Sequence, residues 1–242
     1  MAGVRFGVSY KFLTVTVGSL FLLAACSEEA PQTTQVMESE APMAAPVEPG
    51  LGINPRGKTE LEIDMSRIHN PQIAEVFDYI DTNIDSHVEN LQRWIQQPSV
   101  SNTGEGIQES AYMVEGFFDQ LGCQETEVVD PGITEYGSQA NPVVYAICDE
   151  GAEKTMAVYW MYDTMPITQP DLWLSPPFEA RIVEQPPFDK VIIGRGANNS
   201  KGRQMSFWNA MMSIKAVAGS LPVNLIFLAE GDEAVSYTHL TL

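Results

Sequence analysis

The sequence is poor in positive charge, in histidine and in cysteine. Its 242 residues include 13 Lys and Arg against 32 Asp and Glu, a formal net charge of −19. Because such a surface repels phosphate backbones, we expect no nucleic-acid partner. Three cysteines are too few for a disulfide scaffold, and three histidines are few for a metalloenzyme. Hydrophobic residues at 44 % exclude a fully disordered chain, a fibrous repeat and a multi-span membrane protein.

The first 25 residues have the pattern of an export signal peptide. Arg5 and Lys11 precede an apolar stretch that is short for a bilayer span, and small residues then lead into Cys26. This ending resembles the lipobox of bacterial lipoproteins, in which the cysteine is lipidated; an ordinary signal peptide with a chance cysteine is the alternative. We therefore expect a cell-envelope protein with a lipid anchor at Cys26, and Ser27 favours the outer membrane, facing the periplasm.

Two further regions are expected to lie outside the folded domain. Residues 26–60 are rich in Pro, Glu and Ala and predict a disordered tether. Residues 235–242 match one reading frame of the transposase adapter used in sequencing libraries, which predicts a translated scar rather than a genuine exposed tail. On that interpretation residues 61–234 are a partial domain, inactive by itself, and the native codon 234 begins with G, which leaves Glu among the residues it can encode.

Hydrophobic periods between residues 61 and 234 predict two helices, a set of strands, a third helix and a last strand. The first helix begins at Pro71 and stops before Pro98, and the second ends at Gly122, a natural C-cap. Expected strands cover 125–129, 142–148, 155–160, 190–193 and 223–229, and an apolar helix covers 202–219. This order predicts an α/β fold with a mixed sheet between helices.

Two cysteines flank the predicted hairpin. If Val128 lies opposite Val143 in antiparallel strands, the same register places Cys123 opposite Cys148. In an oxidising compartment the pair can form a disulfide. Two separate buried thiols are the alternative, and the general preference of cysteine for burial favours it.

Three polar segments each follow a predicted strand, where α/β sheets bind ligands. Asp163 ends a hydrophobic strand close to a proline turn. The segment 194–202 combines glycines with small polar residues before a helix, where backbone amides can hold an anion, although the spacing is not that of a P-loop. The segment 230–233 places three carboxylates after a core strand, where burial requires a proton or a cation. Helix caps and solvated loops are the structural alternatives.

In their order, these segments resemble the carnosinase, aminoacylase and succinyl-diaminopimelate desuccinylase family of two-metal peptidases. The resemblance spans about residues 71–234 and rests on Gln97-Pro98-Ser99-Val100-Ser101, Met161-Tyr162-Asp163, Ser175-Pro176-Pro177-Phe178, Gly194-Arg195-Gly196-Ala197, Lys201-Gly202 and Glu230-Gly231-Asp232-Glu233. It implies a zinc-exopeptidase-like catalytic domain, truncated here before a lid or dimerisation domain. It also implies two zinc or other divalent ions, Glu233 as the general base, and Asp163 as the residue that orients a metal-binding histidine.

Three metal-ligand positions depart from the family pattern, and the interrupted codon 234 described above can account for the one at residue 234. The resemblance places a histidine ligand at Met161 and the bridging aspartate at Asn199, and it places a glutamate ligand at Ala234. A thioether is a weak zinc ligand, and a neutral amide lacks the charge that holds two dications together.

The departures leave more than one function open. The first hypothesis is an envelope-anchored, metal-dependent hydrolase of small peptides or N-acyl amino acids, a homodimer in its full length. The second is a relative that binds peptides or amino acids without hydrolysis. A structural envelope protein with an unrelated α/β domain is a third and weaker hypothesis.

Overall fold

The structure is a computed structural model that describes residues 50–54, 64–134 and 137–236. All of these residues fall in one compact unit, Glu48–Leu242. The expected signal peptide, Cys26, most of the expected tether and residues 237–242 lie outside the described residues. Within the described ranges, no helix has both the length and the apolar character needed to span a membrane.

The first predicted helix is two helices in the structure. Helix α1 covers Pro71–Thr82 and helix α2 covers Ile84–Gln96, with Asn83 between them. The Asn83 side chain donates a hydrogen bond to the Tyr79 carbonyl at 2.8 Å, and its backbone leaves the helical region at φ −108° and ψ 17°. Asparagine favours such local bonds over the interior of a helix, so the prediction of one continuous helix is wrong at this residue.

The other helices and strands follow the predicted order. Helix α3, Ile107–Leu121, ends at Gly122, which has the left-handed φ of 87° that a glycine C-cap adopts. The remaining elements are η1 Met65–Arg67, β1 Glu125–Val129, β2 Val143–Cys148, β3 Thr155–Met161, η2 Pro170–Leu172, β4 Arg181–Gln185, β5 Phe188–Ile193, α4 Lys201–Ala218, β6 Asn224–Glu230 and α5 Glu233–Ser236. Strand β4 and the four-residue α5 were not predicted. The apolar residues of β4, Ile182 and Val183, are adjacent rather than alternating, and α5 is too short to show a period.

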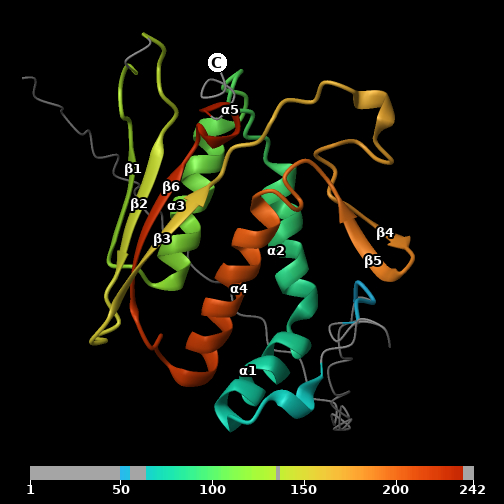
Figure 1. Ribbon diagram of the computed structural model, residues 1–242, viewed down its shortest axis with the longest axis vertical. Helices are drawn as coiled ribbons and strands as arrows, with labels where there is room; N and C mark the ends of the chain where they lie inside the picture. Colours follow the sequence, from blue (N-terminus) through green and yellow to red (C-terminus); the bar gives the residue numbers. More distant parts are fainter. Residues whose placement is uncertain (1–49, 55–63, 135–136, 237–242) are drawn as a thin grey trace, which may run out of the picture. The chain divides into compact units, whose positions relative to one another are not determined.

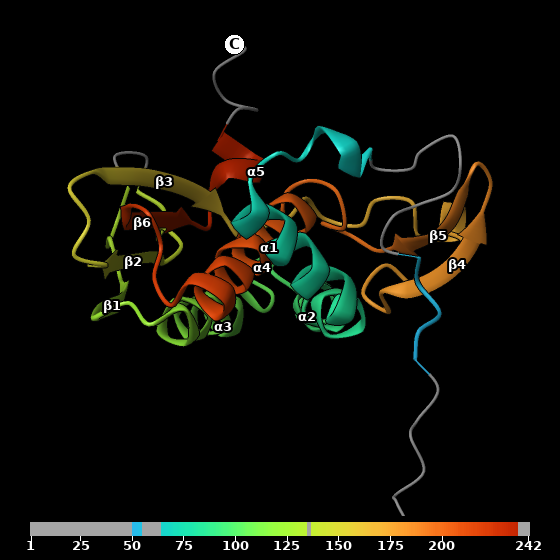
Figure 2. The same ribbon diagram turned by 90° about the horizontal axis from the view of Figure 1, so that it is seen from below.

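Four strands form a mixed sheet in the order β1-β2-β6-β3, so the α/β fold with a mixed sheet is confirmed. β1 pairs with β2 and β2 with β6 in antiparallel fashion, whereas β3 and β6 are parallel. Strands β4 and β5 form a separate antiparallel pair. Helix α3 packs on β1 and β2, and α4 packs against α1, α2 and α3 (Figures 1 and 2). The arrangement brings the carboxyl ends of β3 and β6 to one edge of the sheet.

The hairpin of β1 and β2 bears on two predictions, the register of its strands and the pairing of its cysteines. Val128 pairs with Val144 rather than Val143, so the predicted register is wrong by one residue. Cys123 and Cys148 nevertheless form a disulfide, which excludes two separate thiols in the structure. Cys123 precedes β1, and the bond therefore ties the connection after α3 to the end of β2.

Aromatic side chains fill the core between the sheet and the helices. Phe118 of α3 stacks on Phe227 of β6 with ring centroids 4.3 Å apart, and Trp94 of α2 lies 5.9 Å from Trp160 of β3. All four side chains are at most 2 % exposed. Burying each large apolar side chain stabilises the fold by roughly 1.5–3 kcal/mol, and these contacts fix β3 and β6 relative to α2 and α3.

The opposite face of the sheet is partly exposed. Tyr159 of β3 and Leu228 of β6 are register partners on this face and are 51 % and 46 % exposed. Among the described residues β3 pairs with β6 alone, so its second edge carries no strand.

Candidate functional site at the ends of β3 and β6

The parallel pairing of β3 and β6 places their last residues side by side. Met161 is the register partner of Glu230, and the Tyr162 backbone N–H donates to the Glu230 carbonyl at 2.9 Å. Asp163 is the second residue after the end of β3, and Glu233 follows β6 at the start of α5. The structure therefore brings these two predicted site residues to the same sheet edge, as expected for parallel strands.

Asp163 is the most buried acid of this edge, at 3 % exposure. Its Oδ2 accepts a hydrogen bond from the Ala234 backbone N–H at 2.7 Å, and its buried Oδ1 has no hydrogen-bond partner among the described residues. Burial raises the pKa of Asp163, and the nearby Glu233 carboxylate raises it further, while the Ala234 N–H acts in the opposite direction. Because Ala234 directly follows Glu233 in the chain, the bond from its N–H places Glu233 next to the residue that binds Asp163.

Asn141 binds the acidic segment after β6. Its Nδ2 donates to Asp232 Oδ1 at 2.7 Å and to the Gly231 carbonyl at 2.8 Å, and its backbone N–H donates to Asp232 Oδ2 at 2.9 Å. Burial, together with the charges of Asp232 and Glu233, raises the pKa of Glu230. Sequence reasoning missed Asn141, whose contact with Asp232 spans 91 residues. Its only local signal is its position before a proline at the start of a strand.

The segment Pro98–Ser101 holds the backbone on both sides of Asp163. The Ser99 hydroxyl donates to the Tyr162 carbonyl at 2.7 Å, and the Thr164 N–H donates to the Ser99 carbonyl at 2.8 Å. The Ser101 N–H in turn donates to the Thr164 carbonyl at 3.3 Å. This pairing gives a physical role to the Gln97–Ser101 motif of the sequence.

The Tyr162 side chain packs between the start of β2 and the segment after β6. Its hydroxyl donates to the Pro142 carbonyl at 2.6 Å, and burial is the largest cause of the upward shift of its pKa. A Cβ on Gly231 would lie 2.5 Å from the Tyr162 hydroxyl oxygen, which explains why glycine separates the acidic residues 230 and 232.

The turn 194–200 lies beside the end of β3. Gly196 has a φ of 86°, and a Cβ there would lie 3.1 Å from Cγ2 of Thr164. Asn199 in this turn is exposed, and its Oδ1 accepts a hydrogen bond from the Ser200 hydroxyl at 3.0 Å across a cis peptide bond. Within the described residues no hydrogen bond joins Asn199 to Asp163, so the structure brings the turn to the site but not the Asn199 side chain into contact with this acid.

Lys201 begins α4 and is completely buried. Its Nζ donates to the carbonyls of Trp94 and Gln97 at 2.9 Å and 2.7 Å. Burial lowers the pKa of Lys201 to about 7, while the charge of Asp163 acts in the opposite direction. Sequence reasoning did not assign this residue to the site, although a cation at the amino end of an apolar helix opposes the helix dipole and is an unusual choice there.

The side chains at this edge do not fit a two-zinc centre. Met161 offers a thioether, Asn199 an exposed neutral amide, and Ala234 no side-chain donor at all. Across residues 64–134 and 137–236, no group of three or more His, Cys, Asp and Glu side chains is arranged to hold a metal ion. The unpartnered Oδ1 of Asp163 is one potential ligand atom, but one buried oxygen is not a binding site.

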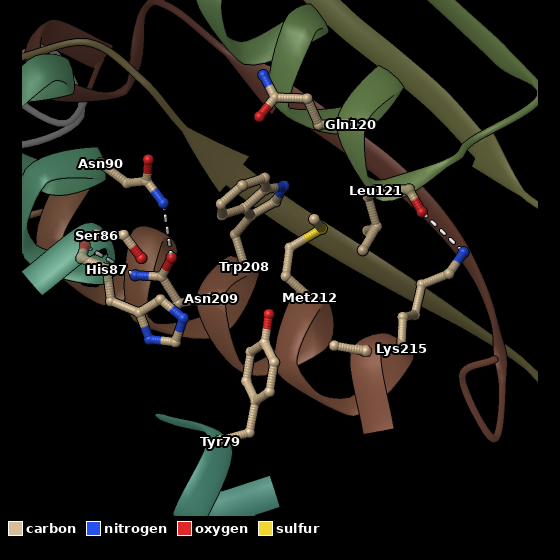
Figure 3. A pocket seen from close by; sticks show the side chains of 11 residues that line it. Tyr79, Ser86, His87, Asn90, Gln120, Leu121, Trp208, Asn209, Met212 and Lys215 are labelled. Atoms are coloured by element: carbon tan, nitrogen blue, oxygen red, sulfur yellow. Dashed lines mark hydrogen bonds between the residues drawn. The ribbon is translucent and has the colours of Figure 1, made fainter. Parts of the chain in front are cut away.

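A groove of about 380 Å³ lies elsewhere, among the helices (Figure 3). Trp208 and Met212 of α4 line it together with Tyr79 of α1 and His87 of α2. Burial lowers the pKa of His87. None of the predicted site residues lines this groove, so we assign it no part in the chemistry at the strand ends.

The fold and the strand-end site define the class of protein to which this chain is similar. The M20 family metallo-carboxypeptidase Sso-CP2 from Sulfolobus solfataricus superposes with a TM-score of 0.52 and 31 % identity, covering 62 % of this chain and 32 % of that one. The Dug1p dipeptidase from Saccharomyces cerevisiae gives a TM-score of 0.60 and 27 % identity, covering 69 % of this chain and 36 % of that one.

The sequence relatives of this chain include dipeptidases. Human Beta-Ala-His dipeptidase is 31 % identical over 170 residues, which are 66 % of this chain and 32 % of that protein. The Cys-Gly metallodipeptidase of Candida albicans is 27 % identical over 171 residues. No family model matches the chain. The relatives confirm the resemblance to carnosinase-like metallopeptidases, and the chain spans about a third of the length of the curated relatives it matches.

Proposed function

We propose that the protein, in its full length, is a hydrolase of the dipeptidase type that cleaves an amide or peptide bond in a small substrate. N-acyl amino acids are the second substrate class to consider. The observation that carries the proposal is geometric: β3 and β6 end side by side, and the residue after Glu233 donates its backbone N–H to Asp163. It is supported by relatives that are themselves dipeptidases.

Glu233 is the candidate general base of this reaction. It begins α5, next to the residue whose backbone N–H binds Asp163. A carboxylate in this position can accept a proton from a water that attacks the scissile carbonyl. Because the residues present do not fit a two-zinc centre, we assign no step of the reaction to a metal ion.

The proposal is tested with purified full-length protein. Turnover is measured on a panel of dipeptides and N-acyl amino acids, with and without added zinc, manganese or cobalt, and after treatment with a chelator. We expect hydrolysis of at least one substrate class. Absence of turnover over the whole panel, in protein that is shown to be folded, would contradict the proposal.

Binding without hydrolysis is a second candidate function, which the substitutions at Met161 and Asn199 favour. Each replaces a ligand that the resemblance requires, and the described residues form no alternative cluster. Elemental analysis and calorimetry distinguish the two candidates. A metal-free protein that binds a dipeptide and releases it uncleaved supports the second function, whereas stoichiometric metal together with turnover supports the first.

We also propose that lipid attached at Cys26 anchors the protein to the cell envelope. The support is the pattern of charge, apolar stretch and small residues before Cys26, all of it outside the described residues. Membrane fractionation of the wild-type protein and of Cys26→Ser tests the proposal. The wild type is expected in the membrane fraction and the variant in the soluble one; identical partitioning would contradict the anchor.

A further inference from the structure

A buried ammonium group joins the start of α4 to the end of α2. Lys201 Nζ binds the carbonyls of Trp94, in the last turn of α2, and of Gln97, its C-cap, and it lies 5.9 Å from the centre of the Trp94 ring. No ion pair among the described residues includes Lys201. Taking such a charge out of water is unfavourable, and apolar residues commonly replace buried charges without loss of stability. A gain in stability is therefore a poor explanation for this lysine.

The end of α2 leads directly to the segment that holds Asp163. Gln97 is followed by Pro98–Ser101, which pairs with residues 162–164 through the Ser99 hydroxyl and the backbone groups of Ser99, Ser101 and Thr164. The chain of contacts therefore runs from Lys201, through the last carbonyls of α2, to the residues on both sides of Asp163. The hydrogen bonds along this chain are 2.7 to 3.3 Å long, two at its first step and three at its last.

The start of α4, which carries Lys201, also packs closely against the turn 194–200. A Cβ on Gly202 would lie 1.9 Å from the Ala197 carbonyl oxygen, so the start of α4 sits directly on the glycine-rich turn. A Cβ on Gly196 would lie 3.3 Å from Cδ of Lys201. The Lys201 side chain therefore lies between this turn and the end of α2 and contacts both.

We propose that Lys201 is a positioning residue of the strand-end site. By binding the last carbonyls of α2 it fixes Pro98–Ser101, and through this segment it sets the position of the Asp163 carboxylate relative to the turn 194–200. Lys201 does not touch the reacting atoms in this role and acts only through Asp163.

Hydrogen exchange of the full chain tests the proposal without reference to activity. In Lys201→Met, the amides of Thr164 and Ser101 are expected to exchange about tenfold faster, because the bonds that hold them loosen locally. The Gln124 amide, which donates to Ile147 in the sheet at 2.9 Å, is expected to keep its rate. Unchanged exchange at Thr164 and Ser101, or the same acceleration at all three amides, would overturn the proposal.

Lys215→Met is the matched control, since it removes a lysine from the other end of the same helix. Lys215 Nζ binds the Leu121 carbonyl at 2.8 Å, so this variant should accelerate exchange at Cys123 and leave Thr164 unchanged. Should Lys201→Met not fold, Ser99→Ala interrupts the next link, the bond to the Tyr162 carbonyl, and is expected to accelerate exchange at Thr164 to a similar extent. If the Thr164 amide of Ser99→Ala exchanges at the wild-type rate, the proposed chain of contacts from Lys201 to Asp163 is refuted.

A kinetic measurement extends the test and rests on the proposed function. In the full-length enzyme Lys201→Met is expected to lower kcat about tenfold while KM stays within about twofold, because misplacement of a catalytic group weakens the transition state more than substrate binding. An equal loss through KM alone would contradict a positioning role. If the wild type shows no turnover, the proposed function fails, and hydrogen exchange still decides the role of Lys201.

Discussion

The two ends of α4 use lysine in the same way but in different surroundings. At the far end Lys215 binds the last carbonyl of α3 and forms an ion pair with Glu150 at 2.6 Å, and its side chain is 24 % exposed. At the site end Lys201 binds the last carbonyls of α2, is fully buried and has no carboxylate in hydrogen-bond contact among the described residues.

This difference indicates which end is built for stability. Glu150 also accepts the Leu221 N–H at 3.1 Å, and the disulfide of Cys123 and Cys148 closes the same region, so the far end has paired charges and a covalent link. The site end combines a lysine whose pKa is lowered by burial with acids whose pKa is raised by burial. Such groups destabilise the fold, and their concentration at one edge is typical of functional sites.

The largest expected effect concerns the site end alone. Glu233→Gln in the full-length enzyme removes the candidate base and is expected to lower kcat about 10³-fold. Because Glu233 is only partly buried, we expect the thermal midpoint to remain close to that of the wild type. Steady-state kinetics and a melting curve check both parts, and a variant that retains full activity would exclude Glu233 as the base.

The second effect concerns the far end alone. Replacing Cys123 and Cys148 by alanine opens a loop with a sequence separation of 25 and is expected to lower the free energy of unfolding by about 2–4 kcal/mol. Urea titration under non-reducing conditions measures the loss, and exchange at Thr164 in native conditions should be unaffected. Alkylation of both thiols in the native wild-type protein before any reductant is added would disprove the bond.

The third effect is a pH dependence that separates the two lysines. Burial lowers the pKa of Lys201 to about 7, below its value in the unfolded chain, so between these values the unfolded state binds the extra proton. The contribution of this group to the free energy of unfolding is therefore highest at high pH, and it decreases as the pH falls toward 7 because the unfolded chain takes up a proton that the folded chain does not. We expect the wild type to gain on the order of 1 kcal/mol per pH unit over Lys201→Met between pH 8 and 10.

Urea titrations at several pH values measure this gain. The difference between the wild type and Lys215→Met should not show the same rise, because Lys215 is partly exposed and paired with Glu150. If the free energy of unfolding varies with pH in the same way for the wild type and for Lys201→Met, the pKa of Lys201 is not lowered in the folded state and the prediction fails.

The smallest expected effect is a stabilisation by Asp163→Asn, in contrast to the destabilisation expected on removal of the disulfide. The raised pKa of Asp163 means that the folded state holds a proton which the unfolded state has already released, so stability falls as the pH rises above about 4. Asp163→Asn removes this penalty and is expected to raise the thermal midpoint at pH 7 by about 2–4 °C. The advantage should fade toward pH 4, and calorimetry at both pH values measures it.

Much of the fold could be predicted because its elements are long and periodic. The apolar stripe of α3, the glycine after it, and the continuous apolar run of β6 each carry a local signal. The break at Asn83 and the register of β1 on β2 could not be predicted. One side-chain hydrogen bond accompanies the first, and the second differs by a single residue from a register that also places an apolar residue of β2 opposite Val128.

The candidate site likewise contains residues that the sequence could predict and residues that it could not. Asp163 and Glu233 could be found because each acid follows an apolar strand, and the resemblance to metallopeptidases added their roles. Asn141 and Lys201 act through partners 91 and 104 residues away in sequence, and such contacts leave no periodic trace. The exposure of Asn199 could not be read from its turn sequence either, because glycine-rich turns permit several side-chain directions.

In the part of the chain that the structure describes, one edge of β3 has no partner strand, and this matters for work with the domain in isolation. An open strand beside an apolar pair such as Tyr159 and Leu228 offers a template for a second polypeptide, so purified domain is expected to associate with itself as its concentration rises. Tyr159→Lys would place a charge on that strand without entering the core. Light scattering over a dilution series would then tell whether a monomer suitable for crystals or spectroscopy has been obtained.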